Sequence, residues 1–146
     1  MKKYFPLALV LIVAGLTGSI VQAQTVSGQR VLATIPFAFS VGKNTLPAGK
    51  YAFRIVNPSS DQKILQIRKV NGSMSVLVQT VGVEVDAADN GRLVFDRYGD
   101  RYFFTQVQLA GASTSLARVQ TRAEKAERKA LTRSNLKRSV VVMVSE

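Results

Sequence analysis

The chain has 146 residues, with 20 lysines and arginines against 9 aspartates and glutamates, which gives a formal net charge of +11 at pH 7. It contains no histidine and no cysteine. This excludes imidazole bases, thiol nucleophiles, disulfides and the usual zinc ligand sets. We therefore expect a non-enzymatic protein without a cofactor or a resident metal.

The N-terminal segment has the three parts of a secretory signal. Lys2 and Lys3 precede an uncharged apolar run over residues 7–16, and small or modest side chains follow at residues 21–23. This pattern predicts cleavage after Ala23 and export to the periplasm or the cell exterior. An uncleaved anchor is the alternative, but the apolar run is much shorter than the roughly 20 residues of a membrane-spanning helix. Residues 24–146 would then form one basic domain.

Period-two alternation, interrupted by turn signals, runs from Val31 to Leu109. It predicts an antiparallel β-sandwich or a small β-barrel of about seven or eight strands. Pro36 cannot donate to a β-ladder, so it marks an edge or a bend in the first strand. The residues between Gly42 and Lys50 are predicted to be a connection.

Two hairpins can be placed in register from their turns. Asn71-Gly72 predicts a type I′ turn, and Gly99-Asp100 predicts the second turn. Beyond Thr80 the apolar phase of the strand changes, which predicts a β-bulge at Gly82. The predicted cross-strand pairs are Leu65 with Val78, Ile67 with Val76, Phe95 with Phe104, and Arg97 with Tyr102.

The composition changes after Gly111 to alanine and charged helix formers. It predicts a helix over about residues 115–133, capped by Thr114 or Ser115, and a final strand over about residues 139–145. An i,i+4 ion pair is expected between Glu124 and Arg128. The predicted apolar stripe of the helix is Leu116, Val119, Ala123, Ala126 and Ala130.

Basic residues are concentrated in this C-terminal segment, which favours contact with an anionic partner. The candidate contact residues are a predicted ridge of Arg118, Arg122, Lys125 and Lys129. A solvated helix face is the alternative. The segment lacks aromatic residues for base stacking, so specific nucleic-acid recognition is not expected. The expected partner is anionic envelope material or a protein.

Arg97 and Arg101 lie at the tip of the second hairpin and are further candidates for anion or partner contact. The same residues also fit a structural role, because Arg97 can stack on Tyr102 and Arg101 can pair diagonally with Asp96. 

Three other functions remain open from the residues alone. An apolar-ligand carrier would line a cavity with Phe37, Phe39, Phe53, Phe95 and Phe104. A carboxylate-dependent hydrolase would bring together two of Asp61, Glu84, Asp86 and Asp96. A calcium site would use Glu84, Asp86 and Asp89, although their spacing is not that of an EF-hand.

Three sequence elements carry a resemblance: residues 35–42 (IPFAFSVG), 46–51 (LPAGKY) and 97–103 (RYGDRYF). With them, the chain resembles a group of small exported β-rich bacterial proteins of acidobacterial type. The resemblance implies an exported β domain and assigns no active-site residue. The sequence therefore predicts a periplasmic or secreted β domain that serves as a binding or structural module of the cell envelope.

Overall fold

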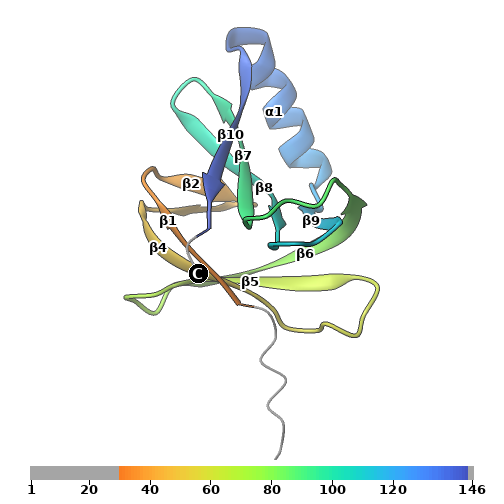
Figure 1. The fold of residues 1–146 in the computed structure, drawn as a ribbon. Coiled ribbons are helices and arrows are strands. Elements are labelled where there is room, and N and C mark those ends of the chain that lie inside the picture. The colour runs from red at the N-terminus through yellow and green to blue at the C-terminus, as the bar shows by residue number, and fades with distance from the viewer. Residues whose placement is uncertain (1–29, 145–146) are drawn as a thin grey trace, which may run out of the picture.

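The computed structural model describes residues 30–144, which form a ten-stranded sheet and one helix (Figure 1). The predicted signal peptide lies outside the described residues. No helix within residues 30–144 is long and apolar enough to cross a membrane. In chain order the elements are β1 Arg30–Ile35, β2 Phe39–Val41, β3 Asn44–Leu46, β4 Gly49–Ile55, β5 Lys63–Lys69, β6 Ser75–Glu84, β7 Arg92–Tyr98, β8 Arg101–Gln108, β9 Thr114–Arg118, α1 Arg122–Ser134 and β10 Lys137–Met143.

The sheet has the strand order β1-β4-β5-β6-β9-β8-β2-β3, and β7 and β10 extend it from the other edge of β8. All pairings are antiparallel except one bridge between β2 and β8 at Ser40 and Phe103. β10 approaches β1, but no ladder joins them and the sheet is not closed into a barrel. The predicted mainly β fold, with a helix before the final strand, is confirmed.

Two of the strands beyond the predicted set, β2 as a separate strand and β3, have a local cause near Pro36. The first predicted strand is interrupted at Pro36, and the predicted connection after Gly42 contains β3, which pairs with β2 as a short hairpin. A proline without a backbone N–H ends one ladder and lets the chain start another.

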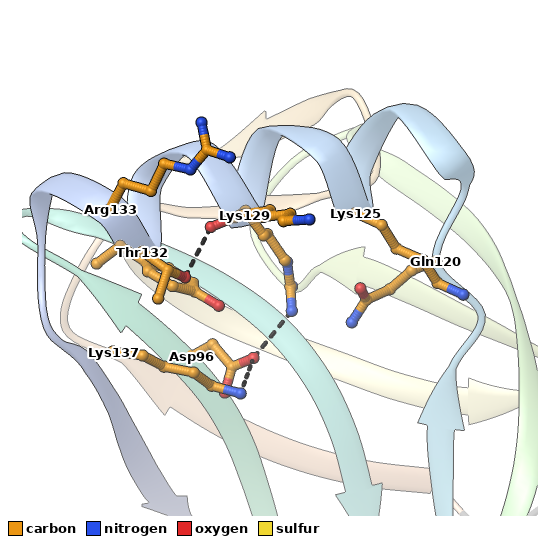
Figure 2. Close-up of a pocket in the computed structure, with 9 residues that line it drawn as sticks. Asp96, Gln120, Lys125, Lys129, Thr132, Arg133 and Lys137 are labelled. Atoms are coloured by element: carbon orange, nitrogen blue, oxygen red, sulfur yellow. Dashed lines mark hydrogen bonds and ion pairs between the residues drawn. The ribbon is translucent and has the colours of Figure 1, made fainter.

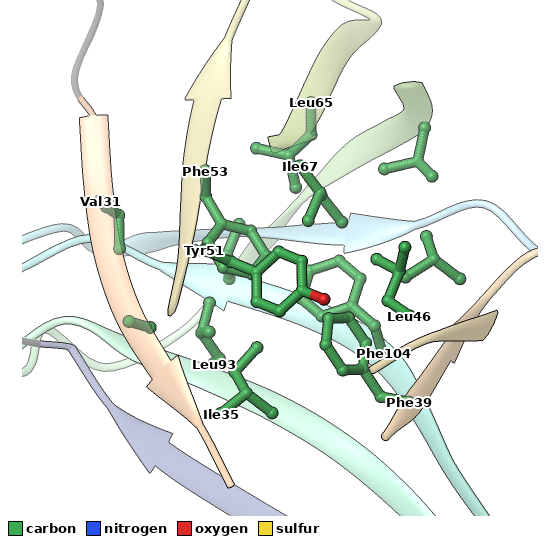
Figure 3. Packing of buried hydrophobic residues seen from close by; sticks show 14 of the residues in the cluster. Val31, Ile35, Phe39, Leu46, Tyr51, Phe53, Leu65, Ile67, Leu93 and Phe104 are labelled. Carbon is green, nitrogen blue, oxygen red and sulfur yellow. The ribbon is translucent and has the colours of Figure 1, made fainter. Parts of the chain in front are cut away.

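The interior is filled by aromatic and aliphatic side chains from strands on all sides (Figure 3). Phe39, Phe53, Phe95 and Phe104 are each 0–1% exposed, and their rings contact one another with centroids 5.4–5.8 Å apart. Tyr51 is also fully buried, and its hydroxyl donates a 2.6 Å hydrogen bond to the Pro47 carbonyl. The polar end of this ring is therefore satisfied inside the core.

Both predicted hairpin registers are confirmed. The predicted type I′ turn is wrong, because neither Asn71 nor Gly72 has a positive φ. The β5–β6 connection is instead closed by a hydrogen bond from the Lys69 N–H to the Met74 carbonyl, which leaves four residues in the loop. A four-residue loop keeps the same register without left-handed residues.

The predicted β-bulge at Gly82 is also wrong. β6 continues through Gly82 and changes its partner at Thr80, from β5 to β9, without a shift in register. Val81 and Val83 lie on the outer face and are 43% and 40% exposed. The change in apolar phase therefore reflects exposed valines and not an extra residue. An irregularity lies elsewhere, between Val94 and Phe95 in β7.

The helix begins at Arg122 and not near residue 115. Residues 114–118 form β9 because they complete ladders with both β6 and β8, and tertiary pairing outweighs a modest helix propensity. Thr121 is the N-cap in place of the predicted Thr114 or Ser115. Its side chain accepts from the Glu124 N–H, and the Glu124 carboxylate accepts from the Thr121 N–H. This reciprocal pair is a capping box.

The predicted final strand is confirmed as β10. It pairs antiparallel with β7, from Lys137 opposite Tyr98 to Met143 opposite Arg92. The pairing covers one edge of a β-branched segment that would otherwise be prone to aggregation. It also brings the end of α1 beside β7 (Figure 1).

Candidate functional site

The face of α1 that lies against the sheet is charged. Glu124 and Arg128 are buried and Leu131 is half-buried, whereas the alanines of the predicted apolar stripe, Ala123, Ala126 and Ala130, are exposed. The stripe therefore does not dock the helix. Glu124 and Arg128 also do not pair with each other as predicted, because each pairs with a residue of the sheet.

The first of these pairs joins Glu124 to Arg118 of β9. The Arg118 Nη1 lies 2.8 Å from Glu124 Oε1 and 3.0 Å from Oε2, and Arg118 Nε donates to the Phe104 carbonyl at 3.2 Å. Burial raises the pKa of Glu124, but the hydrogen bonds from Thr121 and Arg118 and the Arg118 charge outweigh it. The pKa of this carboxyl consequently lies below its ordinary value, and the ion pair persists at neutral pH.

The second pair joins Arg128 to Asp96 of β7. Arg128 Nη1 donates to Asp96 Oδ2 at 2.9 Å, and the same oxygen accepts from Lys137 Nζ at 3.2 Å. The guanidinium lies over the Phe103 ring, 4.9 Å from its centroid. Burial lowers the pKa of Arg128, opposed by the charge of Asp96. Arginine nevertheless remains charged at neutral pH.

A groove of about 510 Å³ runs along this flank of α1. Figure 2 shows Lys125, Lys129 and Arg133 along the helix, with Asp96 and Lys137 on the strands below. Asp96 is the only carboxylate among the described lining residues, against five cations. The full lining is Asp96, Tyr98, Gln120, Lys125, Arg128, Lys129, Thr132, Arg133 and Lys137.

The structure separates the residues of the predicted basic ridge. Lys125 and Lys129 line the groove, and Arg122 is exposed on the same helix outside the lining. Arg118 is not on the helix at all. It lies in β9, is 8% exposed, and uses its guanidinium to hold Glu124. Arg118 is therefore removed from the set of residues available to a partner.

The hairpin-tip residues have structural contacts. Arg97 lies over the Tyr102 ring, 5.3 Å from its centroid, as predicted. Arg101 does not pair with Asp96, because Asp96 is turned toward α1. Arg101 pairs with Glu127 of the helix instead, at 2.6 Å. The tip of the β7–β8 hairpin is thereby tied to the exposed side of α1.

The predicted contact residues include only Lys125 and Lys129 of the groove lining, and its other charged residues are not among them: Asp96, Arg128, Arg133 and Lys137. The order of residues from Thr121 to Glu124 fits the pattern of a capping box, and it could have placed the start of the helix. With that start, Glu124, Arg128 and Leu131 share one face by their spacing. Nothing local indicates that the partner of Arg128 lies 32 residues earlier in the chain.

A second basic cluster lies on the outer face of β1, β4 and β5. Arg30 is directly opposite Arg54 across the ladder, and Arg68 is opposite Ala52. With Lys69 they line a concavity of about 310 Å³ that has no carboxylate among its described lining residues. Like charges directly opposite each other in a sheet repel. Like the groove, this cluster gathers several cations around a concavity, but it lies far from α1 in the fold (Figure 1).

The other candidate sites receive less support. Asp61, Glu84 and Asp86 are exposed and none of them lines the groove with Asp96. Within residues 30–144, no group of three or more acidic side chains is placed to hold a metal ion, so Glu84, Asp86 and Asp89 do not converge on one. The phenylalanines that would line a carrier cavity fill the space between themselves with their own rings.

No protein-family model, no curated protein and no solved structure matches this chain.

Proposed function

We propose that this chain is an exported, non-enzymatic binding domain that contacts anionic material of the cell envelope through the groove beside α1. The observation that carries the proposal is the charge of that groove, where five cations face one carboxylate. Such an excess attracts anions and concentrates field lines along a concave surface.

The exposed cations of the groove are available for binding. Lys125, Lys129 and Arg133 are exposed and make no ion pair within the described part of the chain. Lys137 is half-exposed beside them and pairs with Asp96. A polyanion that meets three or four such cations releases its own counterions, which favours binding at low salt.

The helix presents these cations in a fixed arrangement. Two buried ion pairs, Arg118 with Glu124 and Arg128 with Asp96, attach α1 to β9 and β7, and the capping box fixes its first turn. A prearranged row of cations loses less conformational entropy on binding than the same residues on a free segment. The expected partner is a repeating polyanion, such as an acidic polysaccharide or the phosphates of lipopolysaccharide.

The test is retention of the exported chain on immobilised heparin and on lipopolysaccharide. In a helix variant, Lys125→Gln, Lys129→Gln and Arg133→Gln remove three groove cations. We expect elution at clearly lower salt, with the slope of log K against log salt reduced by about two to three. Retention equal to that of the unmodified chain would exclude α1 as the contact.

The matched control removes the same number of charges from the second basic cluster, through Arg30→Gln, Arg54→Gln and Arg68→Gln. Both variants have the same net charge, so a difference between them reports where the polyanion binds. We expect the control to retain most of the affinity. Equal losses in the two variants would show that only net charge matters, and would contradict a contact specific to α1.

A further inference from the structure

We propose that the groove holds one discrete phosphate group, bound by the buried guanidinium of Arg128 at its floor and by the lysines of α1 at its rim. This inference deepens the proposed function, on which it rests, because it names the chemical group recognised in the same groove. The ligand is a phosphate monoester or free phosphate.

The first observation is an unsatisfied guanidinium. Arg128 is 6% exposed, yet only Nη1 has a hydrogen-bond partner, Asp96. Its Nε and Nη2 atoms are both buried without any partner. In native structures nearly all buried polar atoms are hydrogen-bonded, so two orphaned donors on one charged group call for an explanation.

The two orphaned atoms share one edge of the guanidinium plane. Nε and Nη2 direct parallel N–H bonds outward, and this is the fork that binds two oxygens of a phosphate or carboxylate. Asp96 occupies Nη1 on the other side, and Phe103 covers a face of the plane. The Phe103 ring contacts the face of the guanidinium, and this contact does not satisfy the N–H donors, which point outward in its plane. The free edge is therefore suited to a bidentate oxyanion.

The charge of the groove favours a dianion. The five lining cations outnumber the single carboxylate, Asp96, by four positive charges. A phosphate monoester neutralises two of these, whereas a sugar carboxylate neutralises one. The volume of about 510 Å³ exceeds that of a phosphate alone. It leaves room for the polar group that carries the ester, within the size range of small-molecule sites.

Access to the free edge requires movement of the atoms that cover it, since both orphaned nitrogens are closed to solvent. Lys125 and Lys129 are the exposed lysines of the groove wall on α1. Both have long, flexible stems, so their ammonium groups can turn toward a phosphate bound in the groove. The Arg128–Asp96 pair uses Nη1, and the Arg118–Glu124 pair lies elsewhere on the helix, so neither ion pair has to break for an oxyanion to reach this edge.

The experiment follows the Arg128 Nε–H signal by ¹H–¹⁵N NMR in the full exported chain at low salt. The signal is identified by its loss in Arg128→Lys. Inorganic phosphate, glucose 1-phosphate and glucuronate are titrated separately. We expect a saturable shift of this one signal with either phosphate compound and a much smaller response to glucuronate. Tighter binding of glucose 1-phosphate indicates an esterified ligand, and tighter binding of inorganic phosphate indicates the free ion.

Variants at exposed positions test the site without endangering the fold. Lys129→Gln removes a rim cation, and we expect about tenfold weaker phosphate binding, as for loss of one charge-assisted hydrogen bond. Arg122→Gln removes an exposed cation of the same helix outside the lining, and binding should stay within about twofold. An absent shift, an equal response to glucuronate, or equal losses in the two variants would overturn the proposal.

The outcome is separable from that of the proposed function. Heparin retention could depend on the α1 cations while the Arg128 Nε–H signal does not shift with phosphate. In that case the discrete phosphate site is wrong, and the polyanion contact stands. If retention is independent of those cations, the proposed function itself fails, whatever the NMR titration shows.

Discussion

Arg118 and Glu124 form a buried ion pair in which one guanidinium nitrogen lies within 3.0 Å of both carboxylate oxygens. The same carboxylate accepts a hydrogen bond from the backbone N–H of Thr121, the N-cap residue of α1. One side chain therefore serves both as the attachment of the helix to β9 and as half of its N-terminal cap. Loss of Glu124 removes two supports at once.

We expect Glu124→Ala to lower the free energy of unfolding by about 3–5 kcal/mol, because Arg118 would remain buried without its counter-charge. Urea unfolding followed by circular dichroism measures this. The control is Glu127→Ala, which breaks the exposed pair with Arg101. Such a pair contributes at most about 1 kcal/mol. Similar losses in the two variants would contradict a structural role specific to the buried pair.

Stability should also depend on pH through Glu124. Its pKa in the folded chain lies below the ordinary value of 4.5. A lowered pKa means that the folded state favours the charged form, so this contribution is present above about pH 4.5 and is lost as the pH falls through the lowered pKa. We expect a Glu124→Gln variant to show a weaker fall in melting temperature between pH 5 and about pH 3. Parallel pH profiles for the two proteins would refute this linkage.

The parts of the fold that could be predicted are those in which local pattern and pairing agree. The β5–β6 register follows from alternation around a turn, and Leu65 does lie opposite Val78. β10 follows from an uncharged β-branched run. In the β5–β6 hairpin the paired strands are also neighbours along the chain, so a local signal suffices for the register. For β10 the local run predicts the strand itself, but not its pairing with the distant β7.

The candidate site was harder to predict because its contacts are distant in sequence. The orientation of α1 depends on Asp96, which alternation alone assigns to the polar face of a hairpin beside Arg101. In the structure this face is covered by the helix, and Asp96 takes Arg128 as its partner. Composition predicts a helix from about residue 115, but residues 114–118 form β9, because their composition is ambiguous and the edges of β6 and β8 decide their state.

We expect the Asp96 carboxylate to contribute as much to the stability of the fold beside the groove as Glu124 contributes at the start of the helix. Asp96→Ala leaves Arg128 with no hydrogen-bond partner for any of its guanidinium nitrogens, and we expect a loss of about 3–5 kcal/mol in the free energy of unfolding. Lys137→Gln removes only the half-exposed partner of the same oxygen, and should cost about 1 kcal/mol or less. Chemical denaturation of both variants measures the difference. A larger loss from Lys137→Gln would show that the buried pair is not the main support.

Gly99, at the tip of the β7–β8 hairpin, allows a test of the contact between this tip and Asn135 at the end of α1. Gly99 has a φ of +59°, and a Cβ there would lie 3.1 Å from the Asn135 side-chain oxygen at the end of α1. Gly111 has a similar φ of +70° with nothing within 4 Å of a Cβ. Ala at either position incurs backbone strain of roughly 1–2 kcal/mol, but only Gly99→Ala also displaces Asn135. We expect Gly99→Ala to be the more destabilising of the two in thermal unfolding. Equal shifts in melting temperature would mean that the contact between the hairpin tip and Asn135 contributes nothing beyond the strain.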